Sequence, residues 1–260
     1  MIKIAFFDID WTLYDHASQR WIESGLEAIK KLQEKGIKVF VCSARPYNSQ
    51  ELFGVFDLGI QWDGYIASAG AIAVVGDKTV KKMLMKEEDV YKIIDKTKEL
   101  GRTLEVVTPL DRFLIAPPDH YVSSYHYVYQ YILPEIKDYK GEEATGLLLF
   151  TPESLDEEIH AVCPHLNWYR FHESGVDISD GLHEKGEAIQ SVLDYLGLSK
   201  EEAISFGDDT QDISMARSTG VFVCMGNGKE EAKKAATFVT DRIENDGVEK
   251  ALIKLGLIEK

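Results

Sequence analysis

Short apolar runs and one amphipathic segment define the start of the chain. Residues 2–7 are apolar except for one lysine, and residues 37–42 form a second run that is apolar except for one lysine. Such runs are typical of buried parallel strands. The intervening residues 18–35 have apolar side chains at a helical spacing. These apolar positions are Ile22, Leu26, Ile29 and Leu32. The pattern predicts a strand–helix–strand unit, and therefore a parallel sheet with a right-handed crossover.

The same alternation returns near the other end of the chain. A third strand is predicted at residues 65–69, and the later elements repeat the strand and helix periods. Predicted strands cover residues 203–206 and 221–225, and predicted helices cover residues 186–196, 228–236 and 246–255. The two ends of the chain therefore predict one α/β domain.

The middle of the chain, residues 81–175, has a looser alternation of elements. Predicted helices cover 86–100, 121–133 and 152–162, and predicted strands cover 103–107, 112–116, 147–150 and 167–171. This order favours an inserted α+β domain with an antiparallel sheet, and residues 173–175 read as the linker out of it. The expected domains are thus a core at 1–80 and 176–260 and an insert at 81–175.

Composition excludes several classes of protein. No apolar run approaches the roughly 20 residues that span a bilayer, and the first residues already read as strand, so a cytoplasmic location is expected. Three widely spaced cysteines fit reduced thiols. The net charge of −15 (29 basic minus 44 acidic residues) disfavours nucleic acid and anionic membranes as partners.

Polar side chains follow the predicted strands and open one helix. Asp8 and Asp10 follow the first strand, Ser43 follows the second, Lys185 opens a helix, and the segment 207–212 follows a later strand. Each feature alone is more often a turn, a helix cap or a solvated lysine. Because ligands bind at the carboxyl ends of parallel strands, their occurrence together favours a functional site.

Carboxylates, a hydroxyl and an ammonium suit phosphoryl transfer. This reaction needs a nucleophile, positive charge beside the phosphoryl oxygens and a proton donor for the leaving group. Neighbouring carboxylates raise one another's pKa unless a cation lies among them, and oxygen ligands favour Mg²⁺. With such a metal, a carboxylate can attack phosphorus and form an aspartyl-phosphate.

The order of these motifs resembles that of the haloacid dehalogenase-like (HAD) hydrolase superfamily, specifically the Cof-type phosphatases with a large α+β (type IIB-like) cap. The matching segments are Asp8-Ile9-Asp10-Trp11-Thr12, Cys42-Ser43-Ala44-Arg45, Lys185, Gly207-Asp208 with Asp212, and Met225-Gly226-Asn227. The resemblance implies a Rossmann-like core with a specificity cap. It also implies a Mg²⁺-dependent phosphatase of a small phosphorylated metabolite, such as a sugar phosphate.

The resemblance further implies a role for each matching residue. Asp8 is the nucleophile and a metal ligand, and Asp10 is the general acid and then the base, with its backbone carbonyl on the metal. Ser43 and the backbone N–H of Ala44 hold phosphoryl oxygens, while Lys185 balances charge.

The fourth motif completes this implied site. Asp208 is the remaining metal ligand, and Asp212 holds a metal-bound water or the catalytic lysine. The supporting residues are Thr12, Asp209, Gln211, Asp212 and Asn227.

Three positions depart from the family pattern. Trp11 stands where glycine is usual, and a positive φ there would cost about 1 kcal/mol or more. We therefore expect a negative φ, with the ring beside the loop or lining the pocket. Gln211 and Ala69 each replace a common asparagine.

Two other activities remain open at this stage. A phosphotransferase or phosphomutase would use the same intermediate, and a phosphometabolite-binding protein would retain the site without turnover. The substrate and the choice between monomer and dimer are not encoded in any motif. Five tyrosines at 121–131 are expected to pack within the insert, although they could also line a pocket.

Overall fold

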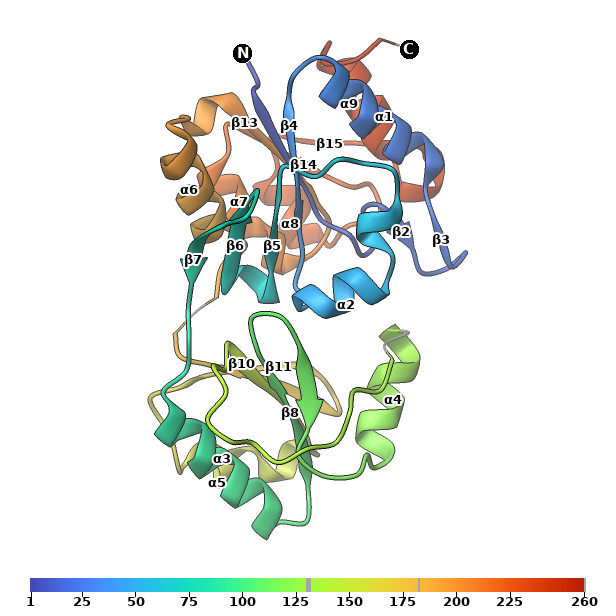
Figure 1. Cartoon of the computed structure of the whole chain (residues 1–260). Helices are drawn as coiled ribbons and strands as arrows, with labels where there is room; N and C mark the ends of the chain where they lie inside the picture. Colours follow the sequence, from blue (N-terminus) through green and yellow to red (C-terminus); the bar gives the residue numbers. More distant parts are fainter. Residues whose placement is uncertain (130–131, 182, 260) are drawn as a thin grey trace. The chain divides into compact units, whose positions relative to one another are not determined.

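The computed structural model describes residues 1–129, 132–181 and 183–259, and it contains two compact units (Figure 1). Unit 1 comprises Met1–Ala44, Phe56–Lys81 and Glu184–Lys260, and unit 2 comprises Arg45–Val55 and Lys82–His183. These units differ from the expected domains because residues 45–55 and 176–183 belong to unit 2 and residue 81 belongs to unit 1.

Unit 1 is built on an eight-stranded sheet, and its mostly parallel pairing confirms the predicted α/β class. The strand order is β15-β14-β13-β1-β4-β5-β6-β7. Neighbouring strands from β15 to β5 are parallel, and β6 is antiparallel to β5. The bounds are β1 Ile4–Phe7, β4 Lys38–Cys42, β5 Gly64–Ala67, β6 Ile72–Val75, β7 Lys78–Lys82, β13 Ala203–Gly207, β14 Val221–Cys224 and β15 Phe238–Val239.

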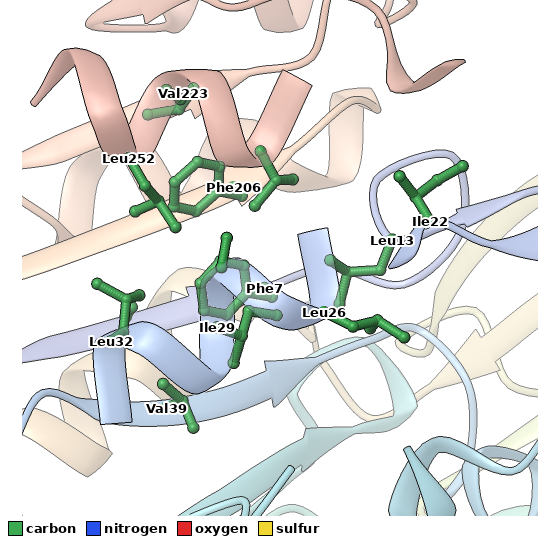
Figure 2. Packing of buried hydrophobic residues seen from close by; sticks show 14 of the residues in the cluster. Phe7, Leu13, Ile22, Leu26, Ile29, Leu32, Val39, Phe206, Val223 and Leu252 are labelled. Atoms are coloured by element: carbon green, nitrogen blue, oxygen red, sulfur yellow. The ribbon is translucent and has the colours of Figure 1, made fainter. Parts of the chain in front are cut away.

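Helices cover both faces of this sheet. Helices α1 (Glu23–Glu34) and α9 (Gly247–Lys254) supply apolar side chains to one face, and α6 (Lys185–Leu196), α7 (Ile213–Ser218) and α8 (Glu230–Ala235) supply them to the other. Figure 2 shows the first of these layers, where Phe7 and Phe206 stack with ring centroids 4.9 Å apart. Each fully buried Phe contributes about 1.5–3 kcal/mol to folding.

A small hairpin precedes α1 and shortens the helix predicted at residues 18–35. Strands β2 (Tyr14–Asp15) and β3 (Arg20–Trp21) pair antiparallel, so the helix begins only at Glu23. The Asp15 carboxylate accepts hydrogen bonds from the Ala17 N–H at 2.9 Å and the Ser18 hydroxyl at 2.5 Å. These bonds stabilise a hairpin turn at residues that the prediction had placed at the start of the helix.

Unit 2 contains an antiparallel five-stranded sheet in the order β11-β12-β10-β8-β9. Helices α3 (Glu87–Glu99) and α5 (Asp156–His160) pack on one face, and α4 (His120–Tyr129) packs on the other. Helix α2 (Tyr47–Leu52) also belongs to this unit. The strand bounds are β8 Thr103–Val107, β9 Arg112–Leu114, β10 Gly146–Phe150, β11 Asn167–His172 and β12 Gly175–Ser179.

The prediction of a linker at residues 173–175 was wrong. Strand β12 begins at Gly175 and pairs with both β10 and β11, so residues 173–174 form a hairpin turn inside unit 2. A Cβ on Gly175 would lie 2.5 Å from Cζ of Phe171, which explains the glycine by close packing. A glycine is also common in linkers, so the sequence alone does not separate the two interpretations.

Short 3₁₀ helices complete the described fold. They cover Val55–Asp57, Ser68–Gly70, Glu153–Leu155, Lys200–Glu202, Thr210–Asp212 and Ile243–Asn245. None of the helices in the described part of the chain is long and apolar enough to cross a membrane.

Of the five tyrosines predicted to pack within the insert, Tyr125 is buried against Phe150, whereas Tyr127 is 85% exposed. The end of the helix predicted at 121–133 includes residues 130–131, which lie outside the described residues.

Candidate active site

Three neighbouring strands of unit 1 end at the same edge of the sheet. Strand β1 lies between β13 and β4, and both pairings are parallel and in register to its last residue. The carboxyl ends of adjacent parallel strands therefore bring their following residues together. These residues are Asp8, Ser43 and Asp208.

Lys185 joins two buried carboxylates at this edge. Its Nζ lies 2.6 Å from Oδ1 of Asp8 and 2.6 Å from Oδ1 of Asp212, and all three side chains are at least nine-tenths buried. Burial alone would lower the pKa of Lys185, but the carboxylates of Asp212 and Asp8 outweigh it and raise this pKa well above its usual value. The lysine is therefore a fixed positive charge at neutral pH.

A close backbone contact holds Lys185 in this place. Lys185 is the first residue of α6, and the N–H of the next residue, Gly186, donates to Oγ of Ser214 at 3.1 Å. A Cβ on Gly186 would lie only 2.1 Å from the Ser214 carbonyl oxygen. Glycine thus lets the start of α6 approach the Asp212 segment closely enough for the ion pair.

Asp212 also orders the loop that carries Asp208. Its Oδ2 accepts the backbone N–H of Asp208 at 2.8 Å and that of Asp209 at 2.9 Å. A Cβ on Gly207 would lie 2.4 Å from the same oxygen, so only glycine leaves room for this carboxylate. Of the two contacts predicted for Asp212, with Lys185 or with a metal-bound water, the structure contains the one with Lys185.

The carboxylates form a cluster whose ligand oxygens all lie within 4.8 Å of one another; its members are Asp8, Asp208 and Asp212. Burial raises the pKa of Asp8 to about 8 despite the opposing charge of Lys185, and repulsion from Asp212 and Asp10 adds to the rise. Burial and repulsion from Asp212 and Asp8 raise the pKa of Asp208 to about 9. Three carboxylates and one ammonium, Lys185, sum to −2 when all are ionised. A divalent cation would balance this charge, and the oxygen donors fit Mg²⁺.

Asp10 lies two residues after Asp8 and has a partner that sequence reasoning missed. Its Oδ1 is 2.6 Å from Nε2 of His16, and its side chain is 26% exposed. His16 follows β2 in the hairpin turn, so its approach to Asp10 depends on the turn. Strand or helix periodicity in the sequence gives no signal for this contact.

The expectation of a negative φ at Trp11 was wrong. Trp11 has φ 61°, in the left-handed region that usually favours glycine. Two hydrogen bonds stabilise this backbone: its N–H donates to the Tyr14 carbonyl at 2.9 Å, and its carbonyl accepts from Nδ2 of Asn227 at 2.8 Å. Asn227 is itself fixed because its Oδ1 accepts the Ile243 N–H at 2.8 Å.

The predicted phosphate-binding segment after β4 is ordered by the backbone. Ser43 is fully buried, and its N–H donates to the Ile66 carbonyl at 3.0 Å. Its carbonyl accepts the N–H of Ala69 at 3.3 Å, so the residue that replaces the common asparagine still holds this segment through its backbone. The neighbouring Ala44 is exposed.

Among the described residues, the buried Thr12 hydroxyl has no hydrogen-bond partner. Thr12 stands two positions after Asp10 in the loop that follows β1. A phosphoryl oxygen or a water molecule would supply the missing partner.

The two remaining predicted residues, Asp209 and Gln211, lie in the loop after β13 and form hydrogen bonds that stabilise it. Asp209 accepts hydrogen bonds from the backbone N–H and hydroxyl of Thr210 and forms a 2.8 Å ion pair with Lys229. The Gln211 carbonyl accepts from the Ser214 hydroxyl at 3.1 Å. Asp209 is therefore a turn and capping residue, in line with the turn chemistry considered for this segment.

Comparison with known proteins agrees with this arrangement. The sequence model of the haloacid dehalogenase-like hydrolases matches residues 5–252. YkrA of Bacillus subtilis (strain 168), which carries a provisional phosphatase name, is 30% identical over 261 residues that cover 99% of each chain.

Two solved structures are similar over nearly the whole chain. A hypothetical protein from Geobacillus kaustophilus HTA426 is 26% identical with a TM-score of 0.91, over 99% of this chain and 100% of the other. A HAD subclass IIB sugar phosphatase is 28% identical with a TM-score of 0.81, over 98% of this chain and 100% of the other.

Proposed function

The chain belongs to the haloacid dehalogenase-like hydrolases and is a phosphatase, and from this premise we propose that it hydrolyses a small phosphorylated metabolite through an aspartyl-phosphate on Asp8. The observation that carries the proposal is the buried Asp8–Lys185–Asp212 ion network beside Asp208. A structural ion pair would not require the third, uncompensated carboxylate at the same strand ends.

In the first step, a carboxylate oxygen of Asp8 attacks phosphorus while the bond from phosphorus to the leaving-group oxygen breaks. Asp10 donates its proton to that oxygen, which departs as an alcohol. Lys185 stabilises the negative charge that spreads over the phosphoryl oxygens, as does the backbone N–H of Ala44. The Ser43 and Thr12 hydroxyls are further donors for these oxygens.

In the second step, water attacks the phosphorus of the aspartyl-phosphate. Asp10, now a carboxylate, accepts a proton from that water, and the bond between phosphorus and the Asp8 oxygen breaks. Inorganic phosphate leaves, and Asp8 and Asp10 return to their starting protonation states. The two carboxyl groups thus keep distinct roles throughout the cycle.

A magnesium ion is the proposed cofactor. Its ligands would be the carboxylates of Asp8 and Asp208 and the backbone carbonyl of Asp10. The carboxylate of Asp212 lies in the same cluster and binds Lys185. When bound, Mg²⁺ supplies positive charge to the phosphoryl oxygens and keeps the buried carboxylates ionised. The raised pKa values of Asp8 and Asp208 without a cation support this assignment.

A sugar phosphate or a similar phosphomonoester is the proposed substrate class. The support is the likeness over both units to a protein described as a sugar phosphatase. Residues 81–175, most of which belong to unit 2, are proposed to set specificity as a cap domain.

The test is the release of phosphate from 4-nitrophenyl phosphate in the presence of Mg²⁺. We expect turnover by the wild type, loss of turnover with EDTA and restoration by added Mg²⁺. Asp8→Asn should lower kcat by at least about 10³-fold because the amide is a poor nucleophile.

The matched control is Asp194→Asn, which makes the same change at an exposed residue of α6 whose side chain, in the described structure, hydrogen-bonds only to Gln190. This variant should retain wild-type turnover. Full activity of Asp8→Asn would contradict the mechanism. Binding of phosphorylated compounds without any turnover would favour a sensor, and transfer to an added alcohol or sugar in place of water would favour a phosphotransferase.

A further inference from the structure

The carboxylate of Asp10 is held by a histidine from a neighbouring turn. His16 Nε2 lies 2.6 Å from Asp10 Oδ1, and the His16 side chain is only 10% exposed. Within the described part of the chain, this is the single hydrogen bond of the imidazole. The pair joins the loop after β1 to the β2–β3 hairpin.

The hairpin fixes the imidazole through its own turn bonds. Asp15, immediately before His16, is 5% exposed and binds the Ala17 N–H and the Ser18 hydroxyl. The Tyr14 ring meets the Trp21 ring of the paired strand at 5.2 Å and the imidazole at 4.9 Å, both edge-to-face. The position of His16 is therefore set by several contacts besides the one to Asp10.

The Trp11 ring also packs against His16. Its ring centroid lies 5.3 Å from that of His16, and its left-handed backbone is held by Tyr14 and Asn227. A glycine at this position would fit the backbone but would remove this aromatic neighbour of His16. The strained tryptophan thus has a physical role beside the proton donor.

We propose that His16 is a positioning residue for Asp10, an inference that rests on the proposed phosphatase function. With a hydrogen on Nε2, the imidazole donates to Oδ1 of Asp10 and fixes the rotation of the carboxyl group. The other oxygen, Oδ2, then carries the proton to the leaving-group oxygen in the first step. The same oxygen accepts the proton of water in the second step, so His16 keeps its hydrogen throughout.

This arrangement makes a prediction about leaving groups. A phosphate ester of an acidic phenol departs readily without a proton, whereas an ester of a more basic phenol depends on the general acid. If His16 aims Asp10, its loss should slow the second kind of ester selectively. A purely structural role would slow all esters together or lower the stability of the fold.

The experiment measures kcat/KM for aryl phosphates of similar size but increasing leaving-group basicity: 4-nitrophenyl, phenyl and 4-methoxyphenyl phosphate. In His16→Leu, the ratio of 4-nitrophenyl to phenyl phosphate should rise about 10-fold over the wild type. In His16→Gln, whose amide can donate to the same oxygen, the ratio should rise at most about 2-fold.

A matched control is His160→Leu, because His160 also lies against a tryptophan, with its ring centroid 5.1 Å from that of Trp168. It should leave the ratio unchanged. Melting temperatures of all variants identify any loss of folded protein. An unchanged ratio in His16→Leu would overturn the inference, as would an equal rise in His16→Leu and His16→Gln.

Failure of the inference is distinguishable from failure of the proposed function. Loss of turnover in Asp8→Asn together with an unchanged ratio in His16→Leu would overturn only the role of His16. Retained turnover in Asp8→Asn would overturn both, because the proton donor would then have no assigned reaction.

Discussion

Trp11 combines an unfavourable backbone conformation with an aromatic contact beside Asp10. A side chain in the left-handed region costs roughly 1–2 kcal/mol, and Trp11 is still 40% exposed. The hydrogen bonds to Tyr14 and Asn227 hold the peptide in place. The tryptophan supplies a ring contact with His16 that a glycine, which would fit this backbone without strain, could not make.

A pair of substitutions separates the strain of Trp11 from the loss of its ring. Both Trp11→Ala and Trp11→Gly remove the ring, but only glycine relieves the positive φ. Trp11→Gly should therefore be more stable than Trp11→Ala by about 1 kcal/mol in the free energy of unfolding, measured with chemical denaturant.

The matched pair is Trp62→Gly and Trp62→Ala, because Trp62 is not among the residues with positive φ. There the order should reverse, with the alanine variant the more stable. Equal stability of the two Trp11 variants would contradict the strain at that position.

Individual site residues could be predicted where a strand end fixes them. Asp8, Ser43 and Asp208 follow apolar runs, and parallel pairing brings such positions together whatever the loops do. His16 could not be predicted in this way because its contact depends on a turn closed by Asp15. The φ of Trp11 depends likewise on a hydrogen bond to a residue far along the chain, Asn227.

At the scale of elements, glycines decide how closely two segments approach. Gly186 in α6 and Gly25 in α1 are both helical glycines near a helix start. The space around them differs: a Cβ would lie 2.1 Å from a backbone oxygen at Gly186 but no closer than 3.6 Å to any neighbour at Gly25. Helix propensity alone would favour alanine at both.

Gly186→Ala should lower the free energy of unfolding by about 1–3 kcal/mol, because the Ser214 backbone must shift. It should also lower turnover, since Lys185 is the adjacent residue. Gly25→Ala should leave turnover unchanged and raise stability by up to about 1 kcal/mol. Thermal and denaturant unfolding measure both effects, and a stabilising Gly186→Ala would contradict the close contact.

Elements with a strong period were predictable, and elements defined by their partners were not. The predicted strand at 103–107 matches β8 in full, and α3 and α6 lie within a residue of their predicted bounds. Strand β12 was missed because glycine suggested a linker, although pairing with β10 and β11 makes it a strand. The β2–β3 hairpin was missed because its two-residue strands have no measurable period.

At the scale of the whole molecule, an anionic substrate must bind to a protein of negative net charge. The net charge of −15 repels an anionic substrate at a distance, and the buried site adds three carboxylates. Lys185 provides one compensating charge within the site, and the proposed Mg²⁺ provides the rest. This charge balance predicts that catalysis depends on the metal. The proposed mechanism adds that Asp8 becomes phosphorylated during turnover.

The most direct measurement is to trap that covalent intermediate. Wild-type protein and Asp10→Asn are mixed with 4-nitrophenyl phosphate and Mg²⁺, quenched in acid within milliseconds, digested and analysed by mass spectrometry. The Asp10→Asn variant should accumulate the intermediate, because this leaving group needs little protonation while the second step loses its base.

The expected result is a phosphoryl group on Asp8, which borohydride reduction converts to homoserine at that position. The adduct should be absent with EDTA and in Asp8→Asn. Turnover with no adduct at Asp8, or with the phosphoryl group on another residue, would contradict the account.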